Sequence, residues 1–67
     1  MMSVTLIYDE GKRIRMKMRC PLSTNIILPL GNVESHFRYF GTLFVDGEVE
    51  TILYKEAYRY ESLNDGA

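Results

Sequence analysis

The sequence is poor in the residues that cross-link a small protein or carry out catalysis. It contains a single cysteine, Cys20, so no disulfide can form within the chain, and a single histidine, His36. One thiol and one imidazole cannot supply the ligands of a structural zinc site. The acids are scattered and the glycines isolated, so their spacing matches no catalytic or phosphate-binding motif. We therefore predict a non-catalytic protein without a metal or cofactor, and we expect Cys20 to be a small buried residue at a strand end.

Long apolar segments are also absent. No run approaches the roughly 20 apolar residues that cross a bilayer, and the first ten residues lack the basic start and apolar segment of a signal peptide. One unpaired cysteine suits a reducing compartment. These features predict a soluble, cytoplasmic protein that does not bind a membrane.

The length limits how stable the chain can be by itself. Its 67 residues contain no repeat and no linker, which predicts one domain over residues 1–67 with a frayed tail at 64–67. A chain of this size buries only about 60% of its unfolded surface, so its stability is marginal. With disulfides and zinc excluded, self-association is the remaining way to bury more surface.

The most regular pattern lies in residues 12–20, which follow a β-branched segment at residues 3–9 and a turn at Gly11. From residue 13 on, charged and apolar side chains alternate strictly, as they do on a half-buried strand. We therefore predict a β-hairpin with cations on one face and apolar groups on the other. The cations are Arg13, Arg15, Lys17 and Arg19, and the apolar residues are Ile14, Met16, Met18 and Cys20.

A second hairpin is predicted around the Asp46-Gly47 dipeptide, because both turn residues tolerate positive φ. Gly41 lies inside the first of its strands and would allow a bulge. Counting outward from the turn predicts five cross-strand pairs: Val45 with Glu48, Phe44 with Val49, Thr42 with Thr51, Phe40 with Leu53, and Tyr39 with Tyr54.

The remaining segments are ambiguous. Residues 24–28 favour a short buried strand and residues 29–32 a turn, whereas residues 32–40 also fit a short helix that ends at Gly41. Residues 46–60 fit a helix as well as a strand, and a helical turn is expected within residues 55–63. We predict a mainly β fold, an antiparallel meander of about five short strands that forms a barrel or sandwich. The alternative is an α+β fold of two β-hairpins with one short helix, of the β-grasp kind.

Charge and aromatic residues suggest two functions. Five of the eight cations lie in residues 12–19, whereas residues 46–65 hold six acids and two cations. The first hypothesis is a small binding module, such as an adaptor, accessory factor or inhibitor, that acts through a protein–protein interface and includes the homodimer as a case. The alternative is a single-stranded nucleic-acid-binding protein that uses the basic strand. The predicted partner-binding residues are Arg13, Arg15, Lys17, Arg19, Tyr39, Tyr54, Tyr58 and Tyr60.

Overall fold

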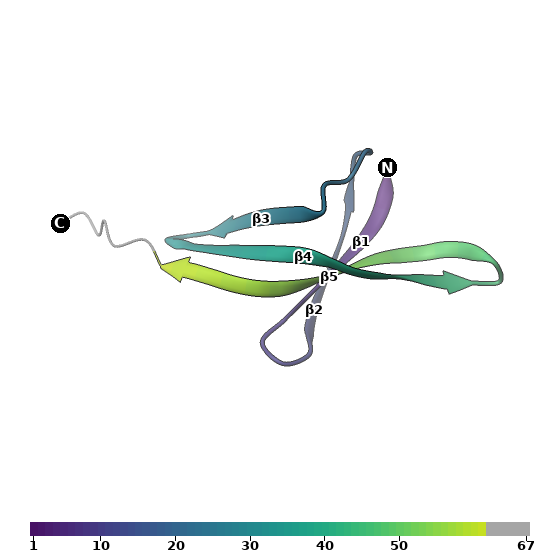
Figure 1. The fold of residues 1–67 in the computed structure, drawn as a ribbon. Coiled ribbons are helices and arrows are strands. Elements are labelled where there is room, and N and C mark those ends of the chain that lie inside the picture. The colour runs from purple at the N-terminus through teal and green to yellow at the C-terminus, as the bar shows by residue number, and fades with distance from the viewer. Residues whose placement is uncertain (62–67) are drawn as a thin grey trace.

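A computed structural model describes residues 1–61, apart from the side chain of Leu30, and it forms one five-stranded sheet (Figure 1). The mainly β fold is therefore confirmed. The predicted frayed tail at 64–67 lies outside the described residues. The strands are β1 (Met2–Tyr8), β2 (Lys12–Met18), β3 (Asn25–Leu30), β4 (Val33–Val45) and β5 (Glu48–Glu61).

The strand order β2-β1-β5-β4-β3 places β2 and β3 at opposite edges of the sheet. Neighbours pair antiparallel except for β1 and β5, which run parallel, so the sheet is mixed and not a purely antiparallel meander. The β1–β2 hairpin crosses the long β4–β5 hairpin near its middle (Figure 1), and the sheet curls into a half-barrel.

The helices considered from the sequence are not formed. Residues 33–40 belong to β4 and residues 55–61 to β5, so both helical predictions are wrong there, whereas residues 62 and 63 lie outside the described part. Phe37 faces the core between the outward-facing His36 and Arg38, a period-two pattern that pairing on both sides of β4 favours over the helical one. Within residues 1–61, no helix is long and apolar enough to cross a membrane.

Residues 29–32 form less of a turn than predicted, because Pro29 lies within β3 and only Gly31 and Asn32 connect the strands. Proline is tolerated there because β3 is an edge strand, where a ladder hydrogen bond is not needed on the outer side. The predicted Asp46-Gly47 turn is confirmed, with φ of 52° and 81° at its two residues.

The pairing of β4 with β5 is interrupted by bulges, which explains which predicted pairs are correct. Extra residues occur at Phe40 in β4 and at Glu50 in β5, and they shift the register in opposite directions. The three predicted pairs outside these two bulges are confirmed, and the bulge expected beside Gly41 is present. The two pairs between the bulges are wrong: Thr51 faces Leu43 instead of Thr42, and Leu53 faces Gly41 instead of Phe40.

The core lies on one face of the half-barrel. It is formed by Val4, Leu6, Ile26, Phe37 and Tyr54. The predicted inward face of β2 is confirmed, since Ile14, Met16 and Met18 are half-buried against this core.

Residues 19–24 carry the chain from edge strand β2 to edge strand β3, and Leu22 packs against the core from this segment. The segment is anchored by two hydrogen bonds: the Tyr54 hydroxyl donates to the Ser23 carbonyl, and the Tyr39 amide donates to the Thr24 carbonyl at 2.9 Å. Cys20 is exposed, so its predicted burial is wrong, because β2 ends two residues earlier and the connection turns its side chain outward.

Candidate binding surface

The β4–β5 hairpin extends beyond the strands that flank it. β3 covers β4 only as far as Arg38, and β1 covers β5 only from Ile52 onward. Residues 40–51 therefore form a two-stranded ribbon, here called the arm, which projects from the sheet (Figure 1). Both outer edges of the arm lack a neighbouring strand among residues 1–61.

The arm carries apolar side chains without a core to bury them. Their exposed fractions lie between 45% and 59%. The exposure follows from strand length, because strands of six or seven residues cannot cover strands of 13 and 14. The exposed apolar residues of the arm are Phe40, Leu43, Phe44, Val45 and Val49.

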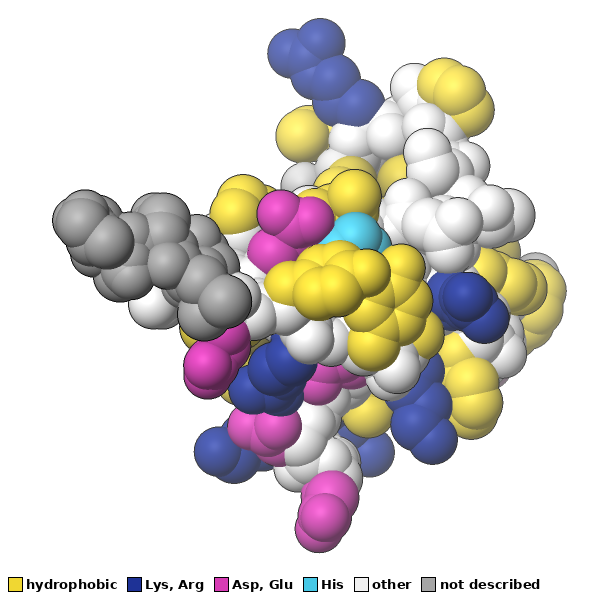
Figure 2. Space-filling model, turned by 60° about the vertical axis from the view of Figure 1, so that its left-hand side comes forward, with side chains coloured by type: hydrophobic (Ala, Val, Ile, Leu, Met, Phe, Trp, Pro, Cys, Tyr) yellow, Lys and Arg dark blue, Asp and Glu magenta, His cyan; other side chains and the backbone are white. Residues whose placement is uncertain are grey.

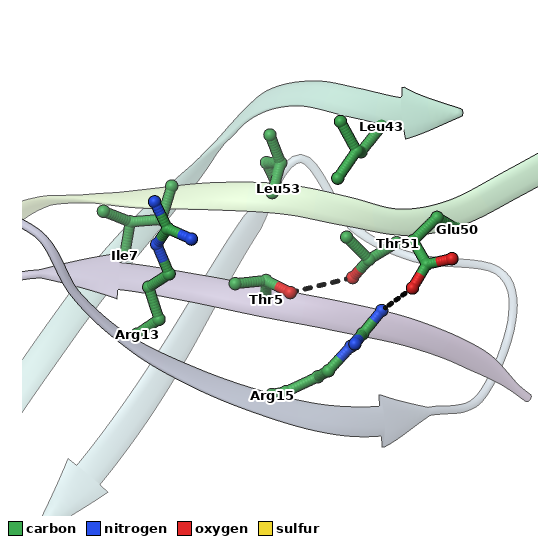
Figure 3. A pocket seen from close by; sticks show the side chains of 8 residues that line it. All are labelled: Thr5, Ile7, Arg13, Arg15, Leu43, Glu50, Thr51 and Leu53. Atoms are coloured by element: carbon green, nitrogen blue, oxygen red, sulfur yellow. Dashed lines mark hydrogen bonds and ion pairs between the residues drawn. The ribbon is translucent and has the colours of Figure 1, made fainter. Parts of the chain in front are cut away.

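A groove of about 420 Å³ lies where the arm joins β1 and β2, on the face of β1 opposite the core residues Val4 and Leu6 (Figure 3). Its apolar lining comes from three strands: Ile7 of β1, Leu43 of β4 and Leu53 of β5. Arg13 and Arg15 of β2 border it on the other side. The size falls within the about 300–1,000 Å³ of pockets that accept ligands, and the lining combines an apolar floor with a cationic edge.

Arg15 is held by a polar chain that crosses three strands. Its Nη2 donates to Glu50 Oε2 at 2.5 Å and its Nε donates to Ser3 Oγ at 3.1 Å. Ser3 Oγ in turn donates to Thr51 Oγ1 at 3.2 Å, and the buried hydroxyls of Thr5 and Thr51 lie 2.9 Å apart (Figure 3). These hydrogen bonds hold the side chains of the groove floor in place, and the contact with Glu50 neutralises Arg15.

The predicted basic row is only partly available to a partner. Arg13, Arg15 and Lys17 point outward from β2 as predicted, but Arg19 follows the end of that strand. Arg15 is paired with Glu50, whereas Arg13 and Lys17 make no ion pair with another residue in the described part of the chain. The row therefore consists of two unpaired cations on either side of a neutralised one.

The predicted tyrosines do not gather beside the basic row. Tyr54 is wrong as a partner-binding residue, because it is 1% exposed and belongs to the core. Tyr39 packs edge-on against it, with ring centroids 6.1 Å apart, and half of Tyr39 remains exposed. Tyr58 and Tyr60 lie near the far end of the β4–β5 hairpin from the arm.

Tyr58 and Tyr60 surround the only histidine. The His36 ring stacks on Tyr58 at 4.6 Å and meets Tyr60 edge-on at 5.3 Å, and its Nε2–H donates to Glu34 Oε2 at 2.9 Å. Figure 2 shows this face, with the histidine beside hydrophobic and acidic side chains. The exposed part of this cluster consists of the two tyrosines and the half-exposed Glu34, whereas His36 is largely covered.

A third polar cluster joins the β1–β2 turn to the end of β5. Arg59 Nη2 lies 2.6 Å from Asp9 Oδ1 and 2.8 Å from Glu56 Oε1. The hydrogen bond from Arg59, with a second one from Ser35, lowers the pKa of Glu56. We interpret this cluster as structural, because it ties together the two hairpins that cross in the sheet.

No protein-family model matches this sequence, and no curated protein or solved structure is significantly similar to it. Within residues 1–61, no three histidine, cysteine or acidic side chains gather as metal ligands. The predictions that the chain lacks enzyme activity and cofactors stay predictions, and its function must be inferred from its surface.

Proposed function

We propose that this chain is a small non-catalytic binding module that acts through a protein–protein interface, and that the arm at residues 40–51 forms the contact. The observation that carries the proposal is the set of five half-exposed apolar side chains on the two faces of the arm. Aromatic residues such as Phe40 and Phe44 are enriched where protein surfaces meet, and exposed apolar surface without a covering strand favours association.

The free energy gained by burying these apolar side chains is too small to hold a complex together without polar or charged contacts. Burying the exposed half of one such side chain contributes about 1 kcal/mol, so a contact that covered both faces of the arm would gain at most about 5 kcal/mol before the cost of association. That sum alone is too small for a tight complex, since a dissociation constant of about 1 μM requires about 8 kcal/mol net. The remainder has to come from backbone pairing along the arm or from charged groups beside it.

Nucleic-acid binding, the alternative, has less support. It is favoured by Arg13 and Lys17, which extend from an edge strand without acidic partners among the described residues. It requires aromatic platforms beside these cations, but Phe37 is buried, and the half-exposed Tyr39 lies on β4, which β1 and β5 separate from β2. Fluorescence anisotropy with an unstructured oligonucleotide at low salt separates the two functions, because binding that weakens steeply with salt would favour nucleic acid.

Photo-crosslinking tests the proposal directly. We expect p-benzoylphenylalanine at position 43, on the arm, to give covalent adducts with protein when the variant is expressed in cells of the encoding organism. The matched control is the same group at position 60, since Tyr60 is about as exposed as Leu43 but lies at the other end of the hairpin. Absence of adducts at position 43, or equal yields at both positions, would contradict an interface on the arm.

A further inference from the structure

We propose that the partner of the arm is a second copy of this chain, whose hairpin tip docks in the groove at the base of the first copy's arm. This inference rests on the proposed function and specifies it further. The tip comprises Val45 to Glu48, and the groove is the one lined by Ile7, Leu43 and Leu53 with Arg13 at its border.

The tip and the groove are complementary in charge and in apolar character. The tip carries two exposed acids, Asp46 and Glu48, which make no ion pair with another residue in the part of the chain described. The groove carries Arg13, which likewise makes no such pair there, beside Arg15, which Glu50 already neutralises. A tip carboxylate would therefore meet Arg13 without displacing an existing ion pair.

The strand geometry places the matching groups on one side of the arm. Side chains two residues apart in a strand point the same way, so Val45 faces the same side as the groove residue Leu43. Glu48 is the cross-strand neighbour of Val45 and lies on that side as well. The tip thus offers an apolar group and a carboxylate on the same face of the ribbon as the groove.

A two-fold axis satisfies both contacts at once. The tip lies two to three residues beyond Leu43 and Thr51, or about 10 Å further along the ribbon. Two arms packed antiparallel, with these faces against each other, would therefore bring each tip over the other copy's groove, and the Leu43 side chains would meet near the axis. Such a contact is self-complementary and closed, as in most small homodimers.

The proposed dimer can be tested by reversing the charge of one residue in each contact and then mixing the two variants. We expect sedimentation equilibrium of the full chain to show a dimer that weakens as salt rises. Glu48→Lys and Arg13→Glu, each alone, should weaken it roughly tenfold or more, because each places like charges at both symmetric contacts. Lys17→Glu is the matched control on the same strand, outside the groove, and should leave the dimer within about twofold of the unchanged chain.

Mixing the two weakened variants should restore dimers, since each contact then joins opposite charges, and so should the double variant E48K/R13E. Circular dichroism confirms that each variant is folded. A dimer that both single variants leave unchanged, or that mixing does not restore, would overturn the groove contact. A chain that stays monomeric at millimolar concentration would overturn self-association, whereas crosslinks from position 43 to a different protein would still support the proposed function.

Discussion

Replacing Tyr54 by phenylalanine tests whether this residue stabilises the core, as its burial indicates, or serves a partner, as the sequence suggested. The ring is almost completely buried, and its hydroxyl donates to the Ser23 carbonyl in the segment that joins β2 to β3. Phenylalanine keeps the ring in place and removes only this hydrogen bond. The variant therefore isolates the attachment of the connecting segment to the core.

The expected cost follows from the single bond lost. An intramolecular hydrogen bond contributes about 1 kcal/mol net, and the Ser23 carbonyl accepts this bond where the structure is partly buried. A chain of 67 residues has a total stability of about 3–10 kcal/mol, so the loss is a large fraction of it. We expect Tyr54→Phe to lower the melting temperature by about 4–8 °C.

The same residue predicts a dependence on alkaline pH. Burial, with a smaller effect of Tyr39, raises the pKa of Tyr54 above the ordinary 10.0. As pH rises past 10 the unfolded chain loses this proton before the folded chain does, so stability falls in that range and is unaffected below it. The phenylalanine variant lacks this loss, and its deficit relative to the unchanged protein should shrink above pH 10.

Thermal melts measure the change in melting temperature, and urea unfolding at pH values from 7.5 to 11 measures the pH dependence, both followed by far-ultraviolet circular dichroism. Tyr39→Phe is the matched control, because its half-exposed hydroxyl only contacts the Thr42 hydroxyl at 2.8 Å, and it should cost at most about 0.5 kcal/mol. If Tyr54→Phe is as stable as the control, or its deficit is constant up to pH 11, the burial argument is refuted.

Three further changes test the turn, the groove floor and the ionic cluster. Gly47→Ala should destabilise the protein by about 1 kcal/mol or more, because Gly47 has a φ of 81°. Gly41 has neither a positive φ nor close neighbours, so Gly41→Ala should cost less, and thermal melts compare the two variants. Thr51→Val leaves the buried Thr5 hydroxyl without its partner and should cost about 1–2 kcal/mol by urea unfolding, whereas the Thr5→Val/Thr51→Val double variant should recover part of this. Because the pKa of Glu56 is lowered in the folded protein, this carboxylate stabilises the fold above about pH 4.5, and the stabilisation is lost as pH falls through the folded pKa. Glu56→Gln should therefore lower the free energy of unfolding in urea at pH 7 and have less effect at pH 3. Equal costs for the two glycines, an additive threonine pair, or a Glu56→Gln deficit independent of pH would each contradict the assignment concerned.

The predictable parts of the fold are those where turn-forming residues and the alternation of apolar and polar residues indicate the same structure. Strict alternation identified β2 and its two faces, and the Asp46-Gly47 dipeptide located the turn of the long hairpin. The parallel pairing of β1 with β5 was not predictable, because it joins residues about 48 positions apart and leaves no local signal. Helical patterns in residues 32–40 and 55–61 were overridden by pairing with neighbouring strands.

The sequence predicted which kinds of residue form the candidate site, but not how they are arranged. The sequence identified the cations of β2 and the surplus of aromatic residues, but it could not show that Tyr54 enters the core. Nor could it show that Phe44 is exposed, because a pattern of apolar residues does not reveal where the covering strands end. Exposure of the arm is a consequence of unequal strand lengths, which become visible only when the partners of each strand are known.

One bulge determines how the basic face of β2 can be used. Adjacent residues of a regular strand point to opposite faces, yet Glu50 and Thr51 both line the groove, because the bulge at Glu50 interrupts the alternation. Without it, Glu50 would face the other side of the ribbon and Arg15 would extend an unbroken row of positive charge toward a polyanion. With it, Arg15 is neutralised, and Arg13 and Lys17, which have no ion pair within residues 1–61, stand about 13 Å apart along β2. An isolated cation beside an apolar groove suits a single carboxylate on an apolar protein surface better than the closely spaced phosphates of a nucleic acid, and this is the physical reason for preferring a protein partner.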